Sequence, residues 1–340
     1  MEQRLQTLIE DTVGDAPGVM LAINAPFQDL HFSGAAGEFC RGTETPLEPG
    51  HSFRIASMSK TFTGTLCAQL MEEGLLSADA AIGDLLPSEI AACIPVIKGH
   101  TMDEITIDLL LQHRAGFNDF ALSPEWFTDI SSDPGRFREP TEIALWALNY
   151  GEPVAAPGET YHYSDTGFVL LGLALEQLAG TPYRKLCRER IFNPLKMNDS
   201  YLEGHEEHRG ALSHPYVVLE GEYIDALQVN GSCDWAAGGH VSTLKDIDAF
   251  LRGLFNQQLF RETATLDQFL KGRLAKPKFS YGMGVGRKQI HGKTLWGHLG
   301  HWGSFMYYCP EERLSLCGTL NYSEAPHNEF IEQVLQTLYS

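Results

Sequence analysis

The chain has 340 residues, of which 43% are hydrophobic and 20% are charged. This balance is ordinary for a folded protein and too apolar for a disordered one. The formal net charge of -19 argues against nucleic acid or an anionic membrane surface as the main partner, because like charges repel. No stretch approaches the ~20 apolar residues of a membrane span, and the acidic, amphipathic start does not resemble a secretory signal. We expect a soluble body of one large domain or two packed sub-domains.

The seven cysteines predict a reducing compartment. They form an odd number, show no C-x-x-C pairing and lie in apolar contexts such as residues 66–68. Free buried thiols fit this pattern, so we expect a cytoplasmic protein. Residues 205–208 read H-E-E-H rather than H-E-x-x-H and lie among polar residues, which favours a solvated loop. We therefore expect no metal and no cofactor.

Strand signals come early and late in the chain, with helical signals between them. Residues 18–23 and 30–34 are short apolar runs separated by turn-forming residues, and they predict a β-hairpin. Apolar residues then recur at four-residue spacing over 58–70 and stop at Gly74, which indicates a buried helix that opens near Ser57. Further helices are predicted at 142–148, 168–176 and about 325–338, and further strands at 279–285, 305–308 and 314–320.

This order predicts an α/β fold in the broad α+β sense. A strand-rich beginning and end suggest that both ends of the chain share one antiparallel sheet flanked by helices, while the middle forms a mostly helical lobe. We assign residues 1–56 together with 236–340 to the sheet sub-domain, and residues 57–235 to the helical sub-domain. The two would form one integrated catalytic unit, with the active site in the cleft between them.

Residues 57–60 read S-M-S-K and fit the pattern S-x-x-K. One helical turn would carry Lys60 back toward the hydroxyl of Ser57. Serine is a weak nucleophile that needs an adjacent base, and a desolvated lysine can be neutral and accept the proton. Backbone N–H groups at the helix start can also help to stabilise an oxyanion. The spacing alone is a weak signal, because a chain of this length contains about one such match by chance.

A second match at residues 242–245, S-T-L-K, is more typical of a helix start. Thr243 is followed three residues later by Asp246, and the apolar Ile247 and Phe250 come next. This arrangement resembles a capping box. We therefore interpret the second match as structural.

Two further triplets support Ser57. Residues 163–165 read Y-S-D just before the apolar helix, and residues 298–300 read H-L-G between two late strands. The order S-x-x-K, then Y-x-N, then K/H-T-G resembles the serine β-lactamase and penicillin-binding-protein family, which includes class C β-lactamases, D-alanyl-D-alanine carboxypeptidases, D-aminopeptidases and esterases. Other segments similar to family motifs are 110–117, 157–168, 237–243 and 281–284. The resemblance extends from about residue 50 to 320 and implies the β-lactamase/transpeptidase-like fold.

The resemblance implies a role for each candidate residue. Ser57 is the nucleophile, Lys60 is its partner, and the phenol of Tyr163 shares their protons and delivers one to the leaving group. The backbone N–H groups of Ser57 and His301 would form the oxyanion hole. The substrate-binding residues would be Asp165, His298, Leu299 and Gly300. An alternative register for the third triplet, 301–303, loses the match that Phe305 makes to the family pattern.

The chain departs from the family at two of its triplets. Asp165 replaces asparagine, and a carboxylate near Lys60 would favour charged lysine and leave Tyr163 as the base. We hypothesise that Asp165 also selects a cationic substrate group such as a free amine; an ion pair with Lys60 or a helix cap is the alternative. His298 and Leu299 replace the lysine and threonine that help to hold a substrate carboxylate, which disfavours a β-lactamase or carboxypeptidase.

The predicted activity is a serine hydrolase that cleaves an ester or amide through a Ser57 acyl-enzyme, on a small ester, peptide or D-amino-acid-type substrate. The alternatives are a β-lactamase or D-Ala-D-Ala carboxypeptidase, an acyltransferase, and a non-catalytic ligand-binding relative. We expect a small-molecule or peptide substrate as partner, and neither nucleic acid nor a membrane. The sequence leaves the oligomeric state open.

Overall fold

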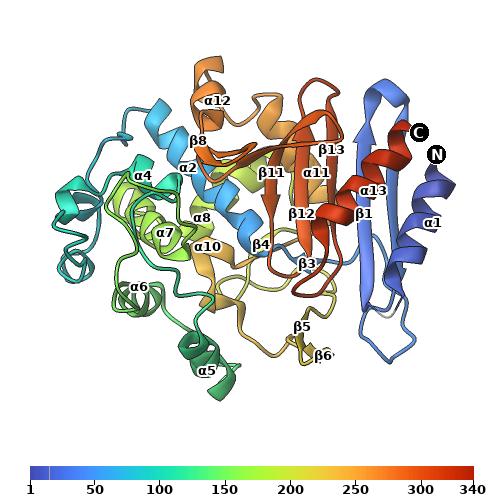
Figure 1. Ribbon diagram of the computed structural model, residues 1–340, viewed down its shortest axis with the longest axis horizontal. Coiled ribbons are helices and arrows are strands. Elements are labelled where there is room, and N and C mark those ends of the chain that lie inside the picture. Colours follow the sequence, from blue (N-terminus) through green and yellow to red (C-terminus); the bar gives the residue numbers. More distant parts are fainter. Residues whose placement is uncertain (15) are drawn as a thin grey trace.

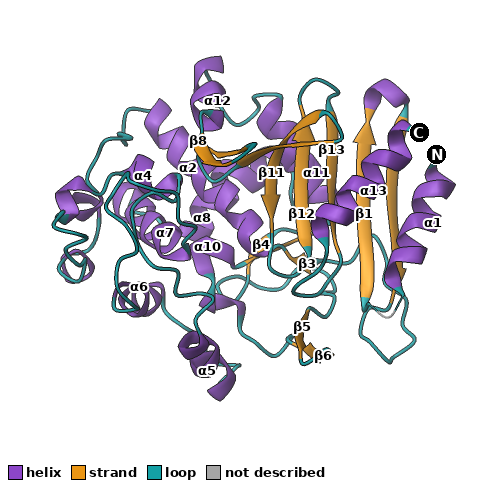
Figure 2. Cartoon of the chain, in the orientation of Figure 1, coloured by secondary structure: helices purple, strands orange, loops and turns teal. Residues whose placement is uncertain are grey.

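An eight-stranded sheet forms the frame of the molecule (Figure 1, Figure 2). The computed structural model describes residues 1–14 and 16–340. The strand order is β2-β1-β13-β12-β11-β10-β9-β8, and every neighbouring pair is antiparallel. The strands are β1 (Gly18–Ala25), β2 (Leu30–Gly37), β8 (Arg273–Lys276), β9 (Phe279–Tyr281), β10 (Gly286–Ile290), β11 (Lys293–Leu299), β12 (Ser304–Cys309) and β13 (Leu314–Thr319). Met20 of β1 lies opposite Thr319 of β13, which confirms that the two ends of the chain share one sheet.

Helices cover both faces of this sheet. α1 (Glu2–Val13) and α13 (His327–Tyr339) pack against each other, and their apolar residues join one core cluster with β1, β2, β12 and β13. α11 (Leu244–Phe255) lies against β1, β12 and β13, and its apolar residues join a second, larger cluster that continues into the helical middle of the chain. β12 and β13 are buried along their whole length because both of their faces are covered.

The middle of the chain is mostly helical and is organised around two buried helices, α2 (Ser59–Glu72) and α7 (Asp165–Ala179). α7 is buried from Thr166 to Leu175, as its apolar sequence requires, and it ends at Gly180 in the left-handed conformation. The other α-helices are α3 (Ser88–Ala91), α4 (Ile107–Leu111), α5 (Pro124–Ser132), α6 (Pro140–Leu148), α8 (Tyr183–Cys187), α9 (Asn193–Leu195), α10 (Trp235–Gly238) and α12 (Thr263–Leu270). A three-stranded sheet has the order β3 (Phe53–Arg54), β7 (His240–Ser242), β4 (Tyr201–Leu202). A two-stranded sheet pairs β5 (Tyr216–Leu219) with β6 (Glu222–Asp225).

The predicted α+β class, hairpin, buried helices and late strands are confirmed, with two corrections. The strand expected over 279–285 ends at Tyr281, because residues 282–285 turn against α2 and Gly284 has a φ of +72°. A Cβ at Gly284 would lie 2.3 Å from the carbonyl oxygen of Lys60, so only glycine allows this approach. His298 and Leu299 lie within β11 rather than between two strands. The sub-domain boundaries at residues 56 and 236 stay a prediction.

Among the described residues, no helix has both the length and the apolar character that crossing a membrane would require.

Candidate active site

Ser57 lies at the junction of the sheet and the helical region. It follows β3 and sits in a 3-10 turn, Ala56–Met58, that leads directly into α2 and contacts β11 and β12. Ala56 has a φ of +48°, a left-handed conformation that is uncommon for a residue with a side chain. Such strained residues persist where the surrounding structure fixes them, and this one turns the partly exposed Ser57 into position above α2.

Lys60 lies one helical turn from Ser57 and is fully buried. Its Nζ donates to Ser57 Oγ at 3.0 Å and to the carbonyl oxygen of Ala237 at 2.8 Å. The same Nζ forms an ion pair with Asp165 Oδ1 at 2.6 Å. Two hydrogen-bond acceptors and a carboxylate therefore surround this buried amino group, a setting that suits an ammonium. The sequence prediction that Lys60 lies beside Ser57 and Asp165 therefore agrees with the geometry.

Tyr163 lies beside this pair, with Lys60 Nζ 5.0 Å from its ring centroid. The pKa of Tyr163 is raised well above its usual value, mainly by burial and then by the negative charge of Asp165; its hydrogen bond with Ser57 partly opposes the rise. The environment therefore keeps the phenol protonated at neutral pH.

His113 packs against the Tyr163 ring. The two ring centroids are 4.2 Å apart, and His113 Nδ1 accepts a hydrogen bond from the Ser164 N–H at 3.2 Å. Burial and the positive charge of Lys60 lower the pKa of His113 well below its usual value, so the imidazole is neutral. The segment 110–117, singled out in the sequence, thus holds Tyr163 and the start of α7 in place.

Asp165 is the first residue of α7, after Ser164 as N-cap. Of the two alternatives to substrate binding, the ion pair with Lys60 is the one present, because Asp165 lies inside the helix rather than at its N-cap, which is Ser164. The Asp165 backbone N–H donates to Asp119 Oδ1 at 3.1 Å, which brings the two residues together.

Two carboxylates that sequence reasoning missed lie close to this ion pair. Burial, and then the charge of Asp165, raise the pKa of Asp119 to about 7 and that of Asp234 to about 6. Asp119 comes two residues after the segment 110–117, and Asp234 lies just before the segment 237–243. Proximity to those two segments was the only signal available, since neither residue belongs to a periodic or spaced pattern.

His298 lies in β11 with both ring nitrogens engaged. Nε2 accepts from the Tyr281 hydroxyl at 2.7 Å, and Nδ1 donates to the carbonyl oxygen of Leu299 at 2.6 Å. Burial and then the charge of Lys60 lower the pKa of His298 to about 3. A neutral imidazole without a free N–H offers no cation to a substrate carboxylate, and the partly exposed Leu299 side chain offers no hydrogen bond.

The end of β11 is joined to the segment before Ser57. A Cβ at Gly300 would lie 2.4 Å from the carbonyl oxygen of Ile55, so glycine allows the close approach. The Ser304 hydroxyl donates to that same carbonyl oxygen at 2.9 Å, while the Gly300 N–H donates to the Ser304 carbonyl at 2.7 Å. His301 is exposed at the tip of this turn, and in the described part of the chain its N–H has no backbone acceptor.

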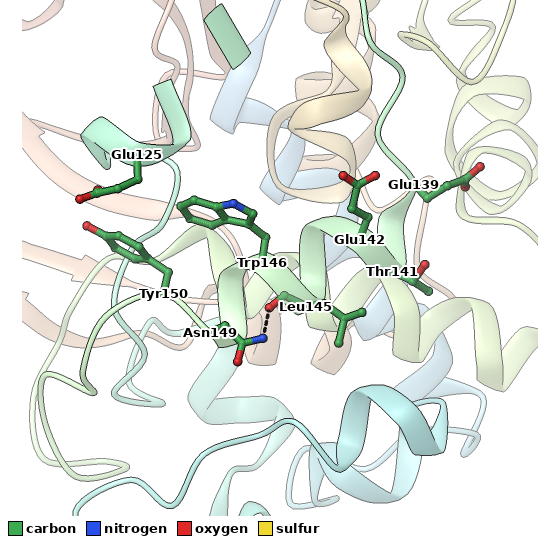
Figure 3. Close-up of a pocket in the computed structure, with 8 residues that line it drawn as sticks. All are labelled: Glu125, Glu139, Thr141, Glu142, Leu145, Trp146, Asn149 and Tyr150. Carbon is green, nitrogen blue, oxygen red and sulfur yellow. Dashed lines mark hydrogen bonds between the residues drawn. The ribbon is translucent and has the colours of Figure 1, made fainter. Parts of the chain in front are cut away.

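A surface cavity of about 760 Å³ lies apart from these residues, over α5 and α6 (Figure 3). Its lining consists of Glu125, Glu139, Thr141, Glu142, Leu145, Trp146, Asn149 and Tyr150. None of them belongs to the candidate catalytic set, so this cavity does not mark the Ser57 site.

Comparisons with known proteins show the family and the fold of the chain. The family model described as Beta-lactamase matches residues 5–336. A D-stereospecific amidohydrolase from Streptomyces sp. has a TM-score of 0.85 at 25% identity, over 98% of both chains. The D-amino acid amidase from Ochrobactrum anthropi SV3 has a TM-score of 0.79 at 26% identity, over 98% of this chain and 99% of that one.

Penicillin-binding protein 4 of Amycolatopsis lactamdurans is 30% identical over 201 residues, which are 58% of this chain and 48% of that protein. The chain thus spans about half the length of this curated relative. The family model, in contrast, covers almost the whole sequence. The chain belongs to the beta-lactamase family, whose relatives similar to it are serine hydrolases.

Proposed function

We propose that the chain is a serine amidase or esterase that cleaves substrates carrying a free amine, of the D-amino-acid type, through an acyl-enzyme on Ser57. The observation that carries the proposal is the buried Lys60 ammonium between Ser57 Oγ at 3.0 Å and Asp165 Oδ1 at 2.6 Å. Lys60 is the activating group for the Ser57 nucleophile, and Asp165 is the acidic side chain next to them.

Proton transfer must begin from a resting state in which Lys60 is paired with Asp165. The sequence suggested Tyr163 as the base, but its raised pKa makes a resting phenolate unfavourable. We assign the proton acceptor to Lys60 instead. A substrate ammonium near Asp165 would compete for that carboxylate and weaken its hold on the lysine proton. Loss of this proton to solvent leaves a neutral amine that accepts the Ser57 proton during attack.

The acyl transfer then follows from the positions of the other groups. The Ser57 Oγ–carbonyl bond forms, and the N–H groups of Ser57 and His301 stabilise the oxyanion. Tyr163 donates its proton to the leaving amine or alcohol and regains one from Lys60 as the carbonyl–leaving group bond breaks. Water then adds to the acyl-enzyme, its proton returns to Ser57, and the acid is released.

The charges around Ser57 support an amine-bearing substrate. Asp119, Asp165 and Asp234 contribute three carboxyl groups, of which Asp165 is paired with Lys60 and Asp234 lies near both Lys60 and Arg54. The nearby imidazole of His298 is neutral and adds no positive charge. An ammonium group would be attracted to this region, while a carboxylate would be repelled. Two structural neighbours named for D-stereospecific and D-amino acid substrates support the same substrate class.

Hydrolysis of D-phenylalanine p-nitroanilide and its N-acetyl derivative tests the proposal, because the two differ in the amine charge. The wild type should prefer the free amine. Asp165→Asn should lose roughly 10- to 100-fold in kcat/KM on the free amine, the worth of a hydrogen bond to a charged group, and much less on the acetylated substrate. Asp103→Asn, at an exposed position, is the control.

Equal losses on both substrates would refute amine selection. Absence of turnover of both anilides and of p-nitrophenyl esters would refute the hydrolase itself. Labelling of Ser57 by a fluorophosphonate without turnover would instead identify a protein that stops at the acyl-enzyme.

A further inference from the structure

Three chemically different side chains meet beside the β5–β6 hairpin, apart from the candidate catalytic residues. Cys40 comes from the segment after β2, His214 precedes β5, and Asp225 ends β6. One potential ligand atom from each lies within 4.8 Å of the other two. His214 Nδ1 and Asp225 Oδ2 are 2.6 Å apart.

The backbone around the three residues is held in place before any ligand binds. The His214 N–H donates to the carbonyl oxygen of Phe39, the neighbour of Cys40, at 3.1 Å. Asp225 Oδ1 accepts from the Leu227 N–H at 2.8 Å, which fixes the carboxylate and directs Oδ2 toward His214. A metal ion would replace the proton between His214 Nδ1 and Asp225 Oδ2 and draw together three donor atoms that already lie within 4.8 Å of one another.

The donor set selects one class of ion. Thiolate and imidazole are ligands of Zn²⁺ and of the chemically similar Co²⁺, whereas Ca²⁺ and Mg²⁺ require oxygen ligands. The thiolate of Cys40 and the carboxylate of Asp225 together carry the two negative charges that balance a divalent cation. Cys40 and His214 are partly exposed, so water can complete a four-coordinate shell.

We propose that Cys40, His214 and Asp225 bind a zinc-type divalent cation that joins the segment after β2 to the β5–β6 hairpin. Binding releases the thiol proton of Cys40 to solvent as the metal–sulfur bond forms. The three residues lie far apart in the sequence, so no metal-binding spacing revealed them. This site is separate from the hydrolytic reaction and does not depend on the proposed function.

The position of the site gives the ion a structural consequence near Ser57. Arg54, three residues before Ser57, donates to the carbonyl oxygens of Ala226 at 2.9 Å and Val229 at 2.5 Å. Asp225 directly precedes that segment, so an ion that holds Asp225 also stabilises the residues that hold Arg54. The bound form should therefore unfold at a higher temperature than the metal-free form.

Titration of Co²⁺ into the full chain, first stripped with a chelator under reducing conditions, tests the proposal. We expect one ion per chain, a thiolate-to-cobalt charge-transfer band in the near ultraviolet, displacement by Zn²⁺ and a raised melting temperature. Cys40→Ser should abolish the band and weaken binding by about tenfold or more, and Asp225→Asn should weaken it comparably.

Two matched controls separate the site from ordinary surface binding. Cys93→Ser removes another partly exposed thiol. His100→Gln breaks another histidine–carboxylate pair, His100 with Glu104, which belongs to no metal-binding group among the described residues. Both should bind like the wild type. No binding by the wild type, binding without the charge-transfer band, or equal affinity of Cys40→Ser and Cys93→Ser would overturn the proposal. Melting of the metal-free variants checks that they remain folded.

Discussion

The chain contains two S-x-x-K segments, and the structure places them in very different environments. In the first, Lys60 is fully buried and its Nζ reaches Ser57 Oγ. In the second, Ser242 is buried in β7, where its hydroxyl hydrogen-bonds with that of Ser200 at 2.8 Å, and Lys245 is exposed on α11. The same spacing therefore pairs serine with lysine in the first segment, whereas in the second segment it spans the corner between a strand and a helix.

The difference depends on where the helix begins. Ser57 lies in a turn that continues into α2, so a separation of three residues returns to the same side of the helix. In the second segment the helix begins after Thr243, whose side chain accepts from the Asp246 N–H at 3.2 Å. This is half of the expected capping box, since the Asp246 carboxylate accepts from the Asp199 N–H and the Ser200 hydroxyl instead. A serine–lysine spacing predicts a reactive pair only when both residues belong to one continuous helical turn.

Replacement of each serine tests the comparison most strongly. Ser57→Ala should lower kcat on a p-nitrophenyl ester on the order of 10⁶-fold, because the nucleophile is removed. Ser242→Ala should leave turnover unchanged. Retained turnover in Ser57→Ala, with the protein folded by circular dichroism, would contradict the assignment of the nucleophile.

Replacement of each lysine sharpens the comparison. Lys60→Met should reduce kcat by about 10²- to 10⁴-fold, the usual contribution of a general base. Lys245→Met should have no effect, because that side chain is exposed. Initial rates across pH measure both; equal rates for the two variants would show that burial of Lys60 does not serve catalysis.

Asp119, which contacts the Lys60 partner Asp165, should make the free energy of unfolding depend on pH. Its pKa is raised from 3.8 to about 7, so the folded state favours the protonated form. The folded state binds the proton more tightly, so this contribution to stability is present below the unfolded pKa and is lost as pH rises through about 7. Asp119→Asn should thus be more stable than the wild type above about pH 8, by a few kcal/mol at most, and similar to it near pH 4.

Urea unfolding at both pH values measures this effect. Asp103→Asn, an exposed carboxylate, should change stability equally little at both. A variant at Asp119 that is less stable than the wild type at the higher pH would show that its charge is favourable.

The smallest effect is expected at the cap of the second segment. Thr243→Ala removes the acceptor for the Asp246 N–H and should cost about 1 kcal/mol of the free energy of unfolding. Thr243→Ser keeps the acceptor and should restore most of it. Turnover of both variants should equal that of the wild type, and a large loss of turnover would connect this corner to catalysis.

The sequence predicted those features that depend on local pattern. The hairpin, the buried helices and the pairing of Ser57 with Lys60 follow from apolar spacing and helix geometry, and motif resemblance indicated Tyr163 and Asp165. Asp119 could not be predicted, because the path of a loop brings it to Asp165. The extent of the strand at 279–285 was also missed, since the turn at Gly284 is fixed by its contact with α2. Long-range approach of backbone segments leaves no periodic signal.

The pairing of β1 with β13 has a consequence for how the chain reaches its native state. β1 is synthesised long before β13, the strand that completes its other edge. Until β13 has been synthesised, the β1–β2 hairpin presents an open row of amide and carbonyl groups that can pair with another chain. Closure of the sheet is then a late event of high contact order, so refolding should be slow and sensitive to protein concentration.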